Sequence, residues 1–277
     1  RINEVLSTNP KILNGTVTET AESDKGTIEF KNVSFKYPDA SDYVLRDISF
    51  KAEKGKTIAF IGATGSGKST LINLIPRFYD ATDGDVLVDG VNVKEYDIES
   101  LNNKLGYVPQ KAVMFSGTVS SNVAYGNNGR DNYSADDIKQ AIKIAQGTEF
   151  VEKMENQYEG AIAQGGSNIS GGQKQRLAIA RAVCRKPEIY IFDDSFSALD
   201  YKTDRVLRSE LKKETAGTTT LIVAQRIGTI KDADCIIVLD KGNMVGKGTH
   251  SELMKNCEVY QQIALSQLSK EELGNDE

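Results

Sequence analysis

Apolar and polar residues alternate along two stretches near the start of the chain, residues 26–36 and 44–52. In the first stretch the apolar positions are Ile28, Phe30, Val33 and Phe35. Such alternation predicts half-buried antiparallel strands. A shorter strand is expected at 85–88, and Asp89-Gly90 directly after it is a hairpin signal.

Later apolar runs are continuous, which is typical of strands buried on both faces. They lie at 57–61, 106–110, 188–194, 218–223 and 234–239. Segments with helical spacing of apolar residues lie between several of these runs. Residues 118–158 are expected to be mostly helical, and a helix over 173–185 should end before Pro187. The alternation of strand and helix predicts an α/β fold with a mainly parallel sheet.

The two ends of the chain differ from the middle. Residues 1–25, after a short helical-looking start at 2–6, are polar and irregular and are interpreted as a linker. We expect the folded domain to cover 26–265, with a helical subdomain at about 112–170, and a charged tail at 266–277. The charged end should already fray from Val259 onward.

Composition narrows the classes of function. The 277 residues are 39% hydrophobic and carry a net charge of −5, which argues against a nucleic-acid-binding protein with its usual basic stripe. Cys184, Cys235 and Cys257 lack metal-ligand spacing and do not suggest a disulfide framework. No apolar run approaches the roughly 20 residues that cross a bilayer. We therefore expect a soluble domain.

A glycine-rich stretch between a strand and a helix provides the first candidate site. It has the P-loop spacing, and its candidate nucleotide-binding residues are Gly62, Thr64, Gly65, Ser66, Gly67, Lys68, Ser69 and Thr70. In such a loop backbone N–H groups cradle phosphates, the lysine reaches the β- and γ-phosphates, and the hydroxyl of Ser69 binds Mg²⁺. The alternative is a glycine turn that binds nothing.

Two carboxylates follow the buried strand 188–192, at the strand end where ligands of α/β sheets lie. Asp193 is predicted to orient Mg²⁺ or its waters, and the alternative is that it caps the next turn. A second glycine motif, Ser170-Gly171-Gly172-Gln173, begins a helix and resembles another anion site. One nucleotide needs only one cradle, so the second should serve a nucleotide held by another chain. A plain helix cap at Ser170 is the alternative.

With these motifs the sequence resembles the nucleotide-binding domain of an ATP-binding cassette (ABC) exporter, from Gly26 to about Leu265. The resemblance implies a P-loop NTPase with a RecA-like core, an antiparallel β subdomain and an inserted α-helical subdomain. It implies ATP and Mg²⁺ as cofactors and a head-to-tail dimer of two such domains. It also implies that residues 1–25 are the link from a transmembrane domain that is absent from this chain, and that the domain lies at the cytoplasmic face of a membrane.

The resemblance also implies roles for single residues. Tyr37 would stack on adenine, and Gln110 would be the Q-loop residue that helps to hold Mg²⁺ with Ser69 and Asp193. Ser170–Gln173 would be the signature and Asp200 the end of the D-loop, both acting on the partner's nucleotide. Tyr37 as a core-edge tyrosine and Gln110 as an ordinary loop residue stay open. His250, the single histidine, is interpreted as a helix-start residue rather than a catalyst.

Two positions depart from the family pattern. Asp194 stands where the family has its catalytic glutamate, and Gln225 stands where it has histidine. Ala163-Gln164-Gly165 also differs from the usual Gly-Glu-x-Gly. The shorter carboxylate and the non-titrating amide predict slow hydrolysis at this chain's own site.

An intact signature beside a weak site favours one half of a heterodimeric multidrug-type exporter. Three alternatives remain: a homodimeric ATPase in which Asp194 still works, changes introduced to trap ATP, and a non-catalytic nucleotide-gated module. A P-loop small-molecule kinase would need a lid and an acceptor site in place of the signature.

Overall fold

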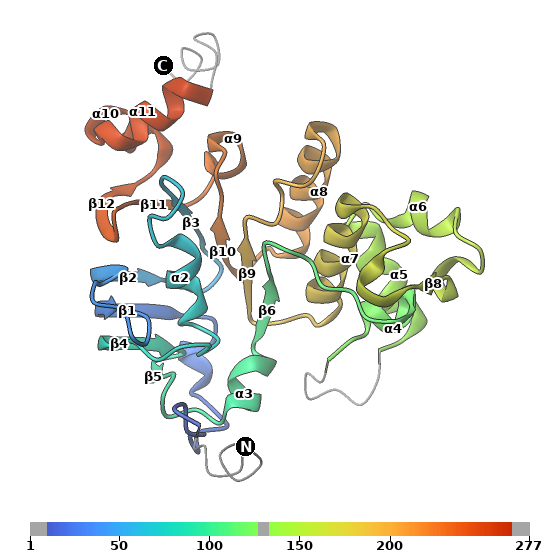
Figure 1. The fold of residues 1–277 in the computed structure, drawn as a ribbon, viewed down its shortest axis with the longest axis horizontal. Helices are drawn as coiled ribbons and strands as arrows, with labels where there is room; N and C mark the ends of the chain where they lie inside the picture. Colours follow the sequence, from blue (N-terminus) through green and yellow to red (C-terminus); the bar gives the residue numbers. More distant parts are fainter. Residues whose placement is uncertain (1–9, 127–132, 268–277) are drawn as a thin grey trace.

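The computed structural model describes residues 10–126 and 133–267, which form three packed regions (Figure 1). The central region is a six-stranded sheet of order β12-β11-β3-β10-β9-β6, parallel except for the β11–β12 pair. Its strands are β3 (Thr57–Ile61), β6 (Leu105–Val108), β9 (Ile189–Asp193), β10 (Thr219–Val223), β11 (Cys235–Asp240) and β12 (Asn243–Gly248). The predicted mainly parallel core is confirmed.

Strand register brings three strand ends to one level at the edge of this sheet. Val223, the last residue of β10, pairs with Phe60 of β3 on one side and with Asp193 of β9 on the other. The glycine-rich loop that follows β3 and the carboxylates that end β9 therefore leave the sheet side by side, as expected at the carboxyl edge of a parallel sheet.

An antiparallel sheet of order β2-β1-β4-β5 forms the second region. Its strands are β1 (Ile28–Phe35), β2 (Leu45–Ala52), β4 (Asp83–Val88) and β5 (Val91–Asn92). The inward face is apolar and packs on the central sheet; Phe50, for instance, packs on Phe60 of β3 with ring centroids 5.4 Å apart. Asp89 and Gly90 both have positive φ at the β4–β5 turn, which confirms the expected hairpin.

The third region is helical and lies beside β6 and β9 (Figure 1). It contains α4 (Val119–Val123), α5 (Ala135–Ile144), α6 (Thr148–Glu152) and α7 (Gly171–Cys184), with the small sheet β7 (Gly117–Thr118) and β8 (Ala161–Ile162). The prediction that 118–158 is mostly helical is confirmed for the described part of that span, because α4, α5 and α6 cover more than half of its residues. Gln146, with φ 57°, follows α5, the longest of these three helices. The other two are short and are joined by loops.

The remaining elements lie around the two sheets, except η2 and η3, which belong to the helical region. They are η1 (Glu22–Asp24), α2 (Lys68–Asn73), α3 (Ile98–Asn103), η2 (Gln157–Glu159), η3 (Gln164–Gly166), α8 (Tyr201–Glu214), α9 (Ile227–Ile230), α10 (His250–Asn256) and α11 (Glu258–Gln267). The expectation of fraying from Val259 is wrong for 259–267, because Tyr260 and Ala264 of α11 are fully buried. Residues 268–277 of the expected tail lie outside the described residues.

The described part of the expected linker lies against the domain. Gly15 and Val17 bond to the backbone of Glu95 and Tyr96, and a Cβ on Gly15 would stand 2.2 Å from the Glu95 carbonyl oxygen. Residues 10–25 are therefore attached to the antiparallel region. The helical start expected at 2–6 lies outside the described residues.

Candidate functional site

The glycine-rich loop connects β3 to α2 and is closed around the ammonium group of Lys68. This group donates to the carbonyl oxygens of Gly62 and Ala63, each at 2.8 Å, and lies 3.3 Å from Ser66 Oγ. Gly67 has φ 100°, and a Cβ there would stand 2.8 Å from the side chain of Leu45. The loop thus requires glycine at the point where the helix begins.

Charge at the loop is balanced by the carboxylates across from it. Burial lowers the pKa of Lys68, whereas Asp194 and Asp193 raise it again. A buried ammonium beside two carboxylates is an arrangement that a polyphosphate with Mg²⁺ would complete, since the cation would compensate the carboxylates and the phosphate the lysine.

Ser69 and Asp193 meet as the magnesium prediction requires. Ser69 Oγ donates to Asp193 Oδ1 at 2.8 Å, and burial raises the pKa of Asp193. A hydroxyl and a carboxylate are the hard oxygen ligands that Mg²⁺ takes, together with waters and phosphate oxygens. The donor set therefore fits the ion. Gln110, the third predicted ligand, directs its amide NH₂ to Asp194 instead.

The side-chain amides of Gln110 and Gln225 both donate to the carboxylate of Asp194. Its Oδ2 accepts from Gln225 Nε2 at 2.7 Å and from Gln110 Nε2 at 3.3 Å. The residue has φ 45°, and its own N–H donates to Val223 O at 2.9 Å. Burial raises the pKa of the Asp194 carboxyl, against the hydrogen bonds from Gln110, Ser197 and Gln225, which lower it.

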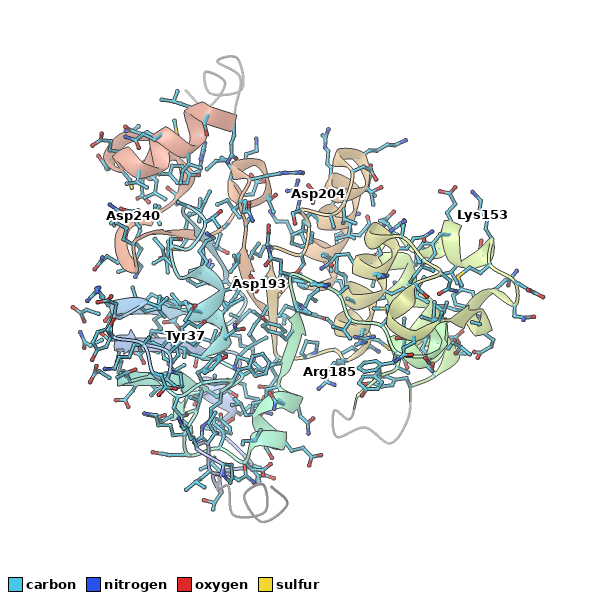
Figure 2. The ribbon with its side chains drawn as sticks, viewed as in Figure 1. Tyr37, Lys153, Arg185, Asp193, Asp204 and Asp240 are labelled. Atoms are coloured by element: carbon cyan, nitrogen blue, oxygen red, sulfur yellow. The ribbon has the colours of Figure 1, made fainter. Side chains whose placement is uncertain are left out.

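Tyr37 lies beside α2, close to the glycine-rich loop (Figure 2). Its hydroxyl is 2.9 Å from Thr70 Oγ1, and its half-buried ring packs edge-on against Tyr79 and Phe35. Thr70 itself is buried. The tyrosine is therefore held at the rim of the phosphate loop, while its predicted stacking on adenine stays a prediction.

The second glycine motif begins α7 in the helical region, away from the phosphate loop of the same chain (Figure 1). Ser170 and Gln173 form a capping box: Ser170 Oγ accepts from Gln173 N at 3.3 Å, and Gln173 Oε1 accepts from Ser170 N at 2.8 Å. The cap explains those two residues but not the glycines. A Cβ on Gly171 would meet nothing within 4 Å, and one on Gly172 would lie 3.4 Å from the carbonyl oxygen of Ala198.

Ala198 and Leu199, just before Asp200, lie next to this motif, because a Cβ on Gly172 would meet both of them within 4 Å. The Asp200 side chain accepts from Thr203 N at 2.9 Å and caps α8. That cap is a sufficient structural role for Asp200 within one chain. A role toward a partner's nucleotide stays a prediction.

Three further residues connect the site, and none was predicted from the sequence. Gln175 is almost fully buried and donates to Pro109 O at 3.2 Å, which ties α7 to the segment before Gln110. Ser195 Oγ donates to Val108 O at 2.9 Å, so the end of β9 is fixed to β6. Tyr107 donates to Asn73 at 2.9 Å beside Asp193. A polar residue on the apolar face of α7 was the available signal for Gln175.

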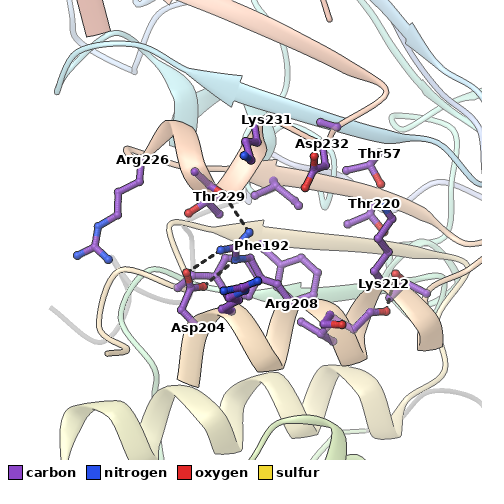
Figure 3. A pocket seen from close by; sticks show the side chains of 18 of the residues that line it. Thr57, Phe192, Asp204, Arg208, Lys212, Thr220, Arg226, Thr229, Lys231 and Asp232 are labelled. Atoms are coloured by element: carbon purple, nitrogen blue, oxygen red, sulfur yellow. Dashed lines mark hydrogen bonds and ion pairs between the residues drawn. The ribbon is translucent and has the colours of Figure 1, made fainter. Parts of the chain in front are cut away.

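A cavity of about 850 Å³ lies between α8 and the central sheet, and residues of α9 line it as well (Figure 3). Inside it Arg208 forms two hydrogen bonds of 3.0 Å with Asp204 and a third, also 3.0 Å, to Gly228 O. This cavity does not include the glycine-rich loop. Of the predicted site residues, none lines it, although two lining residues are close to them in sequence: Arg226 directly follows Gln225, and Phe196 is two residues after Asp194.

His250 agrees with its sequence interpretation as a helix-start residue. It is buried at the first turn of α10, and its Nδ1 lies 2.7 Å from the Tyr260 hydroxyl. The Tyr260 side chain that it contacts belongs to α11 and not to the phosphate loop. Among the described residues no helix is long and apolar enough to cross a membrane.

Comparison with known proteins agrees with this geometry. The family model of the ABC transporter matches residues 45–197. An uncharacterized ABC transporter ATP-binding protein of Mycobacterium tuberculosis is 45% identical over 96% of this chain and 46% of its own length. The ATP-dependent lipid A-core flippase of Haemophilus influenzae is 40% identical over 96% of this chain and 44% of its own length.

A solved structure of a bacterial Atm1-family ABC exporter with ATP bound superposes with a TM-score of 0.89 at 32% identity. The match covers 96% of this chain and 46% of that one, so the present chain spans about half the length of the relatives that it matches. The chain belongs to the ABC transporter family and is a nucleotide-binding domain of the exporter type that binds ATP with Mg²⁺.

Proposed function

We propose that this domain holds Mg·ATP at its own phosphate loop with little hydrolysis, and that it lends its signature to a competent site on a non-identical partner domain. The observation that carries the proposal is the environment of Asp194. A short carboxylate stands at the position of the catalytic base, and two amides, those of Gln225 and Gln110, occupy one of its oxygens.

The length of Asp194 matters because a general base must reach the attacking water. Aspartate is one methylene shorter than glutamate, and a misplacement of about 1 Å costs on the order of 10²-fold in rate. The backbone cannot move forward to compensate, because Asp194 N is bonded to Val223 O and Ser197 Oγ donates to Asp194 O at 2.9 Å. The carboxylate is thus fixed where β9 ends.

Gln225 adds a second deficit. An amide donates to a phosphate oxygen, but it cannot become cationic or transfer a proton. With general acid–base assistance contributing about 10²–10⁴-fold, the two replacements together leave a site that retains ATP binding and has lost most of its turnover. Lys68, Ser69, Asp193 and Tyr37 supply the binding groups independently of this change.

The signature supports the other half of the proposal. Ser170, Gly171 and Gln173 are exposed or half-exposed at the beginning of a 14-residue helix, whose N-terminus favours an anion. Because the phosphate loop of the same chain lies in another region, these groups serve a nucleotide brought by a second domain. A dimer of this kind has one weak site and one strong site.

An exposed aromatic patch near the Q-loop is the proposed contact with the transmembrane domain at the cytoplasmic face of a membrane. Phe115 stacks on Tyr125 with centroids 4.1 Å apart, and Arg181 lies over both rings. Phe115 is 40% exposed and Val113 53% exposed, an apolar surface typical of a protein contact. Arg181 also donates to Val113 O, so the patch is joined to α7 and its signature.

A mixing experiment tests whether the signature of the unaltered chain activates a competent phosphate loop on a second copy. One copy carries Asp194→Glu, Gln225→His and Ser170→Arg, so that its phosphate loop is restored and its signature is blocked. The other copy is unaltered. Each alone should hydrolyse ATP slowly, whereas the mixture should exceed the sum of the two rates at least about tenfold, because it pairs a restored site with an intact signature.

The control replaces Ser170→Arg by Ser167→Arg, an exposed serine just before the signature. That copy keeps its signature and should hydrolyse ATP without the unaltered chain. A mixture that only equals the sum of its parts would refute the lending of the signature. High activity of the unaltered chain alone would instead favour the homodimeric ATPase.

A further inference from the structure

The short helix α9 begins two residues after Gln225 and has no side-chain cap from its own N-cap residue. Its N-cap residue is Arg226, whose side chain has only donors and accepts no hydrogen bond from the helix. The first N–H groups of a helix have no partner within the helix and need an acceptor from elsewhere. Ile227, the first helical residue, is fully buried, so its N–H needs such a partner.

Gln267, the last residue of α11, supplies this acceptor from 40 residues further along the chain. Its Oε1 accepts from Ile227 N at 3.0 Å, and its Nε2 donates to Gln225 O at 2.7 Å. One amide therefore bonds to the backbone on both sides of Arg226. We call these two hydrogen bonds the Gln267 clamp.

The clamp holds the backbone of the residue whose side chain reaches the site. Gln225 O accepts from Gln267, and Gln225 Nε2 donates to Asp194 Oδ2 at 2.7 Å. A continuous chain of hydrogen bonds thus runs from the C-terminal helix to the carboxylate that follows β9. Fixing the backbone at 225–227 restricts the directions in which the Gln225 amide can point.

Helix α11 is itself firmly attached, which gives the clamp a fixed base. Tyr260 is fully buried and its hydroxyl contacts His250 of α10, while Ala264 is buried one turn later. Gln261 donates to Met254 O at 2.8 Å. Helix α11 packs against both α10 and α9 (Figure 1).

We propose that Gln267 is a positioning residue for the γ-phosphate end of the nucleotide site, acting through the backbone of Gln225. The inference rests on the proposed role of Gln225 as a contact of the γ-phosphate. It assigns to the C-terminal helix a part in distinguishing ATP from ADP, because ADP lacks the phosphate that Gln225 would meet.

The test measures binding of Mg·ATP and Mg·ADP by calorimetry for the unaltered chain, Gln267→Met and Gln225→Ala. Methionine keeps the length and helix propensity of glutamine without its hydrogen bonds. Both variants should lower the ratio of ATP to ADP affinity by about twofold to fivefold and leave ADP affinity unchanged. This is the effect expected from losing one neutral hydrogen bond that is exposed to water. Hydrogen exchange of residues 222–230 should be faster in Gln267→Met.

Gln262→Met is the matched control, because Gln262 lies on the same helix and its exposed side chain donates to Glu258 rather than to the backbone of α9. It should change neither quantity. Gln267→Glu keeps the acceptor for Ile227 N but not the donor to Gln225 O. Its affinity ratio and its hydrogen exchange should therefore lie between those of Gln267→Met and the unaltered chain.

The outcomes separate the inference from the function on which it rests. If Gln225→Ala lowers the affinity ratio and Gln267→Met does not, the positioning role is refuted. If hydrogen exchange of 222–230 is also unchanged, the clamp itself is refuted. If Gln225→Ala leaves the ratio unchanged, the proposed contact of Gln225 with the γ-phosphate fails, and the positioning role fails with it.

Discussion

Asp194→Glu together with Gln225→His is expected to raise ATP turnover of this domain by about 10²–10⁴-fold with little change in ATP affinity. The longer carboxylate reaches the attacking water, and histidine supplies a group that can hold and transfer a proton. The binding groups around Lys68 stay the same, so the gain should appear in kcat and not in KM. Steady-state phosphate release at saturating Mg·ATP measures it.

The single variants are the controls for this result. Each alone should restore only part of the rate, because the base and the proton-transfer group act on one transition state and their effects are not additive. Glutamate tolerates φ near 45° less well than aspartate, so a small loss of thermal stability is expected at position 194. A double variant that folds, binds ATP and still does not hydrolyse it would contradict the assignment of both residues.

Lys68→Ala is expected to weaken Mg·ATP binding by about 10²-fold or more. The ammonium is buried at the bend of the phosphate loop, where its charge opposes Asp193 and Asp194, and no other described lysine bonds to the loop. Removing it leaves the phosphates facing two carboxylates without a compensating charge, which is costly at a buried site. Titration with a fluorescent ATP analogue gives the affinity.

Lys56→Ala is the matched control, since Lys56 precedes the same strand and pairs with Asp234 at the surface. Its loss should leave ATP affinity within about twofold. Equal loss of binding in the two variants would show that net charge, and not the position of Lys68 in the loop, determines binding.

The sequence predicted the central sheet well because its strands carry strong, continuous apolar runs. It also placed the hairpin at Asp89-Gly90, where the turn requires positive φ at two positions. It missed β12, which has a row of exposed and half-exposed residues and pairs only at the edge of the sheet. Such a strand exists because β11 offers it hydrogen bonds, and that partner is not visible in the local pattern.

The C-terminal helix shows the same limitation. Residues from Val259 onward looked like the beginning of a charged tail, yet α11 is held by Tyr260 and by the contact of its hydroxyl with His250. Periodicity over so short a segment is weak, and the contacts that stabilise it come from another helix.

The sequence suggested the candidate site residues one by one, but not the contacts between them. The P-loop spacing predicted Lys68 and Ser69, and the end of the buried strand predicted Asp193. The fold places Ser69 and Asp193 in hydrogen-bond contact, and their roles toward a nucleotide stay predictions. That Gln110 and Gln225 would share one oxygen of Asp194 depends on three loops meeting in space. The hydrogen bonds of Gln175 and Gln267 likewise join residues far apart in sequence.

A single-turnover measurement on the unaltered chain, with protein in excess over labelled ATP, tests most directly whether this domain binds Mg·ATP at its own site without turning it over efficiently. We expect the nucleotide to bind and to remain ATP. Its hydrolysis should be at least about 10²-fold slower than in the Asp194→Glu, Gln225→His variant. Hydrolysis by the unaltered chain as fast as by that variant would contradict this expectation and make Asp194 a sufficient base.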